Sequence, residues 1–185
     1  MQSFETFIGQ SLKHFIKVGS IVPSSKYLAK RITKYIKSPI VLELGPGTGV
    51  FTEEILKKLP KDGKLISIES NEVFAKYLEN KIKDKRLIIC HGDALKLRSF
   101  LKKQGLEKVD VIVSGLPIGN FNKEDKRKLL NEIAECLADD GTYLQFEYFL
   151  AGIKAVKKVF PKITLSFELL NFPPAFVMRC NKAKK

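Results

Sequence analysis

The chain has 185 residues, of which 44% are hydrophobic and 29% are charged, so it is long enough to fold as one domain with a substantial buried core. Its formal net charge of +13 favours an anionic partner, either nucleic acid or a membrane surface. The alternative is that the lysines only form a solvated surface. Three isolated cysteines without a C-x-x-C pair exclude a disulfide framework, and no apolar run is long enough to span a membrane, so we expect a cytoplasmic protein.

The first 38 residues are expected to form a helical cap that precedes the main fold. Apolar residues recur at helical spacing over residues 4–16, and again over residues 27–36 after a break at residues 19–23. The segment contains seven basic residues and one acidic residue, so both helices are amphipathic and basic. Helices of this kind bind at the surface of anionic membranes. The alternative is that both helices only cover the sheet with their apolar faces.

From residue 40 onward, strand patterns and helix patterns alternate along the chain. The predicted strands span residues 40–44, 64–69, 86–90, 109–114, 141–149, 162–170 and 174–180, and the predicted helices span residues 49–59, 71–82, 94–104, 123–138 and 152–159. A turn is predicted at residues 139–141, ahead of the fifth strand. The last two strands have no helix between them, which predicts an antiparallel hairpin at the end of an otherwise parallel sheet.

These elements predict a single α/β domain over residues 1–185, in which helices cover both faces of a Rossmann-like, seven-stranded sheet. We expect the cap to span residues 1–38 and the ligand-binding core to span residues 39–185.

The loop after the first strand carries the most informative motif of the chain. Glu43 lies near the end of that strand, and Gly45, Gly47 and Gly49 follow at every second position before a helix pattern begins. A strand, a glycine loop and a helix in this order present backbone to a nucleotide-like ligand at the carboxyl edge of an α/β sheet. Dinucleotide sites have a third glycine where this chain has Val50, and they hold a pyrophosphate that Glu43 would repel. S-adenosylmethionine (SAM), which carries an ammonium and a sulfonium, suits this carboxylate better; a glycine-rich turn without a ligand is the alternative.

Polar residues also end the next three predicted strands. Glu69 ends the second strand, where a carboxylate accepts both hydroxyls of a ribose; a surface glutamate is the alternative. Asp93 follows the third strand and would accept the amino group of an adenine, with Ala94 leaving room beside the ring, although an aspartate there is also a helix cap. Ser114 ends the fourth strand, which lies beside the first strand at the switch point where a methyl acceptor should lie. The alternative is a turn that ends the strand and has no role in the site.

These motifs resemble the successive motifs of class I SAM-dependent methyltransferases. A narrower resemblance is to the bacterial phospholipid N-methyltransferases, and it covers most of the chain. It depends on residues 19–25 with Leu28-Ala29, residues 41–52, Ser114-Gly115-Leu116-Pro117, Gln145-Phe146 with Tyr148, and Asn171 with Pro173-Pro174-Ala175. The resemblance implies a class I methyltransferase sheet and transfer of methyl groups from SAM to phosphatidylethanolamine, up to phosphatidylcholine.

The motifs and the resemblance together imply a set of site residues and no metal. The cofactor-binding residues are Glu43, Gly45, Gly47, Thr48, Gly49, Glu69, Ser70, Gly92, Asp93, Ala94, Ser114 and Leu116, and the candidate catalytic residues are Ser114, Glu147, Tyr148 and Tyr27. Glu147 departs from the family, which more often has a small hydroxyl residue there. Its carboxylate would bind a cationic head group or take its proton, or it indicates a different amine acceptor. Tyr27 and Tyr148 would hold a methylated head group by cation–π contact.

Ribosomal RNA adenine dimethyltransferases share the glycine and Gly-Asp-Ala motifs and provide the main alternative, an RNA adenine N6-methyltransferase. In those enzymes an Asn-Leu-Pro-Tyr motif holds the target amine and stacks its aromatic ring on a flipped base. Ser114 and Ile118 occupy these positions here, so nucleic acid is not expected as a partner. A non-catalytic module that binds SAM or lipid is a second alternative. We expect the protein to act on an amino-phospholipid at the inner face of the membrane, as a peripheral protein without an obligate protein partner.

Overall fold

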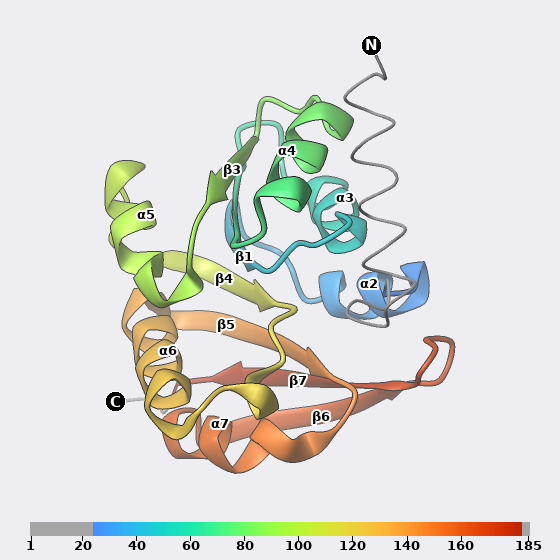
Figure 1. Ribbon diagram of the computed structural model, residues 1–185, viewed down its shortest axis with the longest axis vertical. Helices are drawn as coiled ribbons and strands as arrows, with labels where there is room; N and C mark the ends of the chain where they lie inside the picture. Colours follow the sequence, from blue (N-terminus) through green and yellow to red (C-terminus); the bar gives the residue numbers. More distant parts are fainter. Residues whose placement is uncertain (1–23, 183–185) are drawn as a thin grey trace.

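The computed structural model describes residues 24–182; residues 1–23 and 183–185 lie outside the described part. Seven strands form one sheet in the order β3-β2-β1-β4-β5-β7-β6 (Figure 1). They are β1 (Ile40–Leu44), β2 (Lys64–Glu69), β3 (Leu87–His91), β4 (Val109–Ser114), β5 (Leu137–Glu147), β6 (Lys162–Glu168) and β7 (Ala175–Asn181). Only β7 runs antiparallel to its neighbours β5 and β6. The mostly parallel sheet with a C-terminal antiparallel hairpin is thereby confirmed.

The central strands β1, β2 and β4 are buried on both faces, which explains their nearly continuous runs of aliphatic residues. Their register brings their carboxyl ends together, because Leu44 pairs with Ile68 of β2 and with Ser114 of β4. The amide of Gly45 donates to the carbonyl of Ile68 (2.9 Å), and the amide of Gly115 donates to the carbonyl of Leu44 (2.9 Å). The loops that follow these three strands therefore begin in contact with one another.

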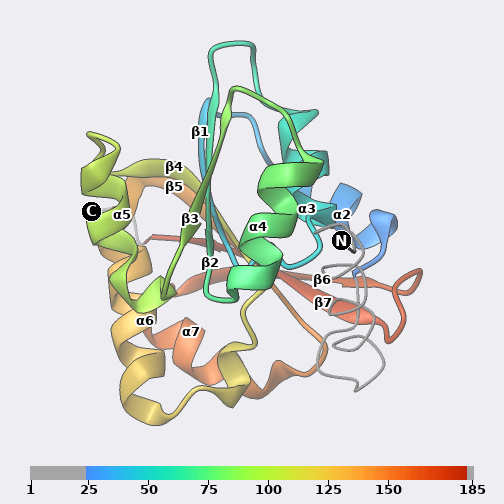
Figure 2. The same cartoon turned by 45° about the horizontal axis from the view of Figure 1, so that its top comes forward.

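Helices cover both faces of the sheet (Figures 1 and 2). They are α2 (Lys26–Thr33), α3 (Val50–Leu56), α4 (Glu72–Lys81), α5 (Leu97–Lys103), α6 (Lys123–Cys136) and α7 (Ile153–Val159), with short 3-10 turns η1 (Ala94–Lys96), η2 (Ile118–Asn120) and η3 (Leu150–Gly152). One hydrophobic cluster joins the sheet to α5, α6 and α7, and a second joins it to α2 and α3. Within residues 24–182, none of the helices has the length and hydropathy needed to cross a bilayer.

The predicted helix over residues 94–104 is divided into η1 and α5. The carboxylate of Asp93 accepts the amide of Leu95 (2.9 Å), and the amide of Lys96 donates to the carbonyl of Asp93 (3.0 Å). An aspartate that bonds to the backbone just after it favours a tight turn over a regular first helical turn. The α-helix consequently begins only at Leu97.

The turn predicted at residues 139–141 is wrong, because these residues lie within β5, which begins at Leu137. Lys108 and Lys182 both pair with the carboxylate of Asp139, at 3.3 and 3.5 Å. The pairing of β4 with β5 shifts register at this point, because Val109 pairs with Leu137 whereas Val111 pairs with Thr142. Contacts with neighbouring elements thus keep an acidic, turn-prone sequence extended.

The second helix of the predicted cap, α2, is part of the core. Leu28 and Ile32 are fully buried and Ile36 is 6% exposed, in the cluster that includes α3. The apolar face of this helix covers the sheet and is not available to a membrane. The first predicted helix, over residues 4–16, lies outside the described residues, so its role stays a prediction.

Candidate active site

The glycine loop after β1 leaves one open position at the carboxyl edge of the sheet. Gly47 has a φ of +55°, and a Cβ placed on it would meet no atom within 4 Å. Gly49, the N-cap of α3, has a φ of +84°, and a Cβ on it would overlap the side chain of Leu78. Both positions therefore require glycine, the first for backbone conformation and the second for packing as well. Thr48, between them, is half-buried.

Glu43 is buried beneath this loop, with only 1% of its surface exposed. One carboxylate oxygen, Oε2, accepts the hydroxyls of Ser67 (2.6 Å) and Thr52 (2.8 Å), while Oε1 is buried without a hydrogen-bond partner among residues 24–182. Burial raises the pKa of Glu43 to about 7. The hydrogen bonds from the two hydroxyls lower this pKa, and the nearby charge of Glu69 raises it further. A buried acceptor with a bare oxygen is suited to a cationic or N–H donor supplied by a ligand.

Glu69 joins the end of β2 to the glycine loop. Its Oε2 accepts the amide of Gly47 (3.0 Å) and its Oε1 accepts the amide of Asn71 (2.9 Å), the N-cap of α4. Each carboxylate oxygen has a second lone pair, so the same group can still accept ligand hydroxyls. The structure therefore brings together Glu69 and Gly47, two residues that the sequence predicted for one site. Ser70, next in the chain, is exposed.

The loop after β3 adjoins the loop after β2, because the amide of Gly92 donates to the carbonyl of Glu69 (2.8 Å). Asp93 is exposed and already caps η1, while its neighbour Ala94 is 8% exposed and packs in the hydrophobic core. The Asp93 carboxylate thus has the helix-capping role that was its alternative, and it keeps lone pairs for a ligand.

Ser114 is fully buried at the end of β4, and its hydroxyl accepts the amide of Leu116 (3.2 Å). Leu116 is held a second time, because its carbonyl accepts the side-chain amide of Gln145 (2.8 Å). The Leu116 side chain lies against the glycine loop, where a Cβ on Gly45 would be 2.9 Å from its Cδ2. Ser114 therefore shapes the loop between β4 and η2 and does not face open space.

Glu147 connects two other loops of the same edge. It is 5% exposed, and its two oxygens accept the amide of Gly119 in η2 (3.1 Å) and the amide of Gly152 in η3 (3.3 Å). Burial raises the pKa of Glu147, while the backbone donors and the charge of Lys126 lower it. The residue that departs from the family pattern thus holds η2 and η3 together.

The two candidate tyrosines lie on different elements. Tyr148 follows β5, is half-buried and packs edge-on against Phe146, with ring centroids 6.0 Å apart. Phe146 in turn stacks on Phe51 of α3 at 4.9 Å. Tyr27 is on α2 and is 57% exposed.

Several residues that shape the site were not assigned a role by the sequence. Gln145 accepts the hydroxyl of Tyr143 (2.6 Å) and donates to the loop after β4. Ser67 and Thr52 hold Glu43. The position of Gln145 within an apolar run of the sequence could have indicated a role in shaping the site, because a polar side chain buried there must be hydrogen-bonded. The partners of that glutamine could not be read from the sequence.

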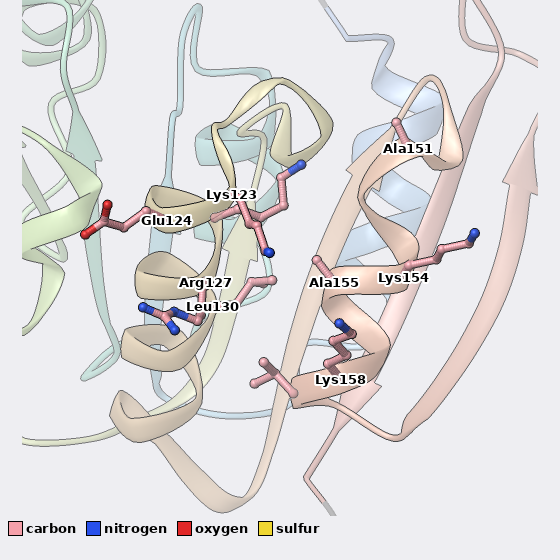
Figure 3. Close-up of a pocket in the computed structure, with 10 residues that line it drawn as sticks. Lys123, Glu124, Arg127, Leu130, Ala151, Lys154, Ala155 and Lys158 are labelled. Atoms are coloured by element: carbon pink, nitrogen blue, oxygen red, sulfur yellow. The ribbon is translucent and has the colours of Figure 1, made fainter.

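A cavity of about 660 Å³ lies between α6 and α7 (Figure 3), and no residue of the glycine loop lines it. Half of the residues that line it are basic: Lys123, Glu124, Lys126, Arg127, Leu130, Ala151, Lys154, Ala155, Lys158 and Val159. None of these residues belongs to the predicted site. Within residues 24–182, no group of three or more histidine, cysteine, aspartate or glutamate side chains is placed to hold a metal ion.

Comparisons with known proteins identify the family and the fold. The family described as "Methyltransferase domain" matches residues 41–141. An ornithine lipid N-methyltransferase from Singulisphaera acidiphila is 32% identical over 190 residues, covering 100% of this chain and 99% of that protein. A ribosomal RNA small subunit methyltransferase H from Clostridium botulinum (strain Okra) is 32% identical over only 80 residues, 43% of this chain and 26% of that protein.

Among solved structures, the O-methyltransferase TomG from Streptomyces achromogenes, in complex with SAM, superposes with a TM-score of 0.67 at 15% identity. The superposition covers 95% of this chain and 89% of that chain. At this identity the likeness concerns the fold, and it extends over nearly the whole domain.

Proposed function

Because this chain belongs to the SAM-dependent methyltransferases, we propose that it methylates the amine of an amino-lipid at a membrane surface. The observation that carries the proposal is the similarity to an ornithine lipid N-methyltransferase, which extends over the full length of both chains. Phosphatidylethanolamine and amine-bearing lipids without phosphate are both acceptors of the required chemistry. A peripheral position at the inner face of the membrane is part of the proposal.

The residues at the carboxyl edge fit SAM. When bound, SAM supplies an electrophilic methyl group on a positively charged sulfur. The open position at Gly47 lets backbone approach the methionine part, and Glu69 beside it would accept ribose hydroxyls. Oε1 of Glu43, which is buried without a hydrogen-bond partner among residues 24–182, would accept from the ammonium, and exposed Asp93 would accept from the adenine amino group.

On the acceptor side, the chain contributes mainly alignment. An unprotonated amine must lie in line with the methyl group, and we expect the loop from Ser114 to Ile118 to be next to that position. Glu147 keeps this segment close to η3, and Tyr148 and Tyr27 would hold a methylated ammonium by cation–π contact. Glu147, Tyr148 and Tyr27 are also the candidates for taking the proton of the amine.

RNA methylation is the second candidate, since parts of the chain match ribosomal RNA methyltransferases. Ile118 argues against it, because it occupies the position where an adenine dimethyltransferase has a stacking aromatic ring and it is fully buried. Base–aromatic stacking contributes about 1–3 kcal/mol per base, so a site without it should hold a flipped base poorly.

A methyl-transfer assay tests the proposal. Purified protein is incubated with radiolabelled SAM and offered phosphatidylethanolamine vesicles, ornithine-lipid vesicles and ribosomal RNA in parallel. We expect label in one or both lipids and background in RNA. Label in RNA alone would establish the second candidate. Binding of SAM without transfer to any acceptor would point to a non-catalytic module and contradict the proposal.

A further inference from the structure

The turn between β6 and β7 exposes an unusual concentration of apolar side chains. Leu169 is 72% exposed, Leu170 is 63% exposed and Phe172 is 88% exposed, and residues 169–174 contain no charged residue. Single exposed apolar residues are ordinary, but three large ones within four positions form a patch of the kind that marks an interaction site. The predicted strand over residues 162–170 in fact ends at Glu168, so Leu169 and Leu170 belong to the turn.

This turn is anchored to the rest of the fold. Asn171, between the exposed residues, is 2% exposed; its side chain donates to the carbonyl of Pro173 (2.6 Å) and accepts the amide of Ser25 (2.7 Å). The guanidinium of Arg31 pairs with Glu168 at 2.6 Å. The turn and α2 are therefore held together, and the apolar side chains project from a fixed base.

The turn lies at the same edge of the sheet as the candidate active site. β6 and β5 both run antiparallel to β7, so β6 ends where the parallel strands end. In the order β4-β5-β7-β6, β6 lies three strand spacings from β4, which is about 14 Å across the sheet. The register places Leu165 level with Ser114, so β6 ends three residues beyond the end of β4. Figures 1 and 2 show the turn projecting beyond the sheet on the side of α2.

The neighbouring surface of α2 is basic. Lys26 and Lys30 are exposed one helical turn apart, and neither forms an ion pair with any residue from 24 to 182. Exposed Tyr27 lies between them in the sequence. Apolar side chains beside unpaired lysines combine the two attractions that bring proteins to an anionic bilayer, which are burial of apolar area and contact with charged lipids.

We propose that the apolar turn at residues 169–172, flanked by Lys26 and Lys30, is the surface by which the protein docks on a bilayer containing anionic lipid. The apolar side chains enter the interfacial region, and the active-site edge then faces the lipid head groups. This inference rests on the proposed function, because it places that site against its lipid substrate. It keeps the basic residues of α2 that were predicted to face a membrane, but it replaces the buried apolar face of that helix with the exposed turn as the apolar contact.

The positive charge near the turn favours an anionic bilayer as its binding partner over a second copy of the chain or residues 1–23. A second copy of the chain would carry the same lysines and the same net charge of +13. Residues 1–23 contain two lysines and one glutamate, so they offer no acidic complement either. An anionic bilayer supplies both the apolar interior and the negative charge.

Flotation with vesicles of phosphatidylglycerol and phosphatidylcholine tests the proposal on the full chain. The variant Leu169→Ser/Leu170→Ser/Phe172→Ser should lose about tenfold or more in vesicle partitioning at both low and high salt. The control Leu165→Ser removes an exposed apolar residue of β6 outside the turn (44% exposed) and should stay within about twofold of wild type. Lys26→Gln/Lys30→Gln should lose binding only to anionic vesicles and only at low salt, where surface charge is unscreened.

SAM affinity by calorimetry shows that each variant is folded. A folded triple variant that floats like wild type would overturn the proposal. If that variant also changes from dimer to monomer in sedimentation, the turn is an interface between two copies of the chain and not a membrane contact. Flotation that appears only after deletion of residues 1–18 would overturn it as well, since that segment would then cover the turn.

The vesicles contain no amine lipid, so docking is measured independently of the reaction. Loss of flotation in the triple variant, together with methyl transfer to RNA alone, would support the docking surface and overturn the proposed function. Normal flotation of the triple variant, together with methylation of amino-lipid in detergent, would support the function and overturn the docking surface.

Discussion

Two halves of the same sheet edge use their polar residues differently. Around β1, β2 and β3, the polar groups are only partly used within residues 24–182: Oε1 of Glu43 is buried without a hydrogen-bond partner there, Gly47 borders open space and Asp93 is exposed. Around β4 and β5, the polar side chains are engaged inside the protein. Ser114 holds Leu116, and Glu147 holds η2 to η3.

The difference indicates that one half of the edge is suited to binding a ligand and that the other half is suited to holding loops in position. A site that must take up a charged cofactor needs acceptors that become satisfied only when the ligand arrives. A site that promotes an in-line displacement needs fixed loops more than it needs a reactive side chain. We infer that the first half binds the cofactor and that the second half positions the acceptor.

The strongest way to break this comparison is to remove Glu147. Glu147→Ala should lower the free energy of unfolding by about 2–4 kcal/mol, because it leaves two buried amides unpaired. Urea denaturation measures this loss, and methyl transfer should fall with it. Glu147→Gln keeps an acceptor for one of the two amides, so its free energy of unfolding should lie between those of wild type and Glu147→Ala. A Glu147→Gln protein with wild-type stability and no methyl transfer would instead identify the carboxylate as the base.

Glu43 should make the free protein less stable as pH rises. Its pKa is raised from 4.5 to about 7, so between these values the unfolded chain releases a proton that the folded protein keeps. Stability therefore falls as pH rises from 4.5 to 7 and stays lower above pH 7, by up to about 3 kcal/mol. Urea denaturation at pH 5 and pH 8 without SAM measures the drop. Glu43→Gln should lack this part of the pH dependence, and an identical drop in that variant would exclude Glu43 as its source.

Glu69→Ala tests the cofactor half directly. The variant should bind SAM more weakly by about 1–3 kcal/mol, the usual result of leaving buried polar partners unpaired. Calorimetry on both proteins measures the difference, and far-ultraviolet circular dichroism controls for folding. Equal affinities would remove Glu69 from the site.

The smallest expected effect sharpens the comparison within the glycine loop. Gly47→Ala should lose about 1–2 kcal/mol of stability from the left-handed backbone, and SAM affinity should also fall because the methyl group fills the open position. Gly105 provides a matched control, since it has a φ of +70° and no atom within 4 Å of its Cβ position, but it lies outside the site. Gly105→Ala should lose similar stability and bind SAM normally. Equal affinities for the two variants would show that Gly47 does not border the cofactor.

The sequence determined the sheet and the contact between Glu69 and the glycine loop because both depend on short-range patterns. Buried parallel strands require continuous aliphatic runs, and left-handed turns require glycine, so residues 41–49 could be interpreted directly. Carboxyl ends of neighbouring parallel strands meet at one edge, which is why Glu69 could be placed with the glycine loop before any coordinates were known.

Tertiary structure alone decided the roles of Ser114 and Glu147 and the two apolar surfaces near residues 27–36 and 169–172. Gly119, which Glu147 binds, lies 28 residues away in the chain, and no local pattern relates the two. An apolar run is compatible with either a buried helix face or an exposed turn, and the outcome depends on which elements pack against it. Leu28 became core because α3 and the sheet cover it, whereas Leu169 became surface because Asn171 and Glu168 bind α2 and leave the turn uncovered.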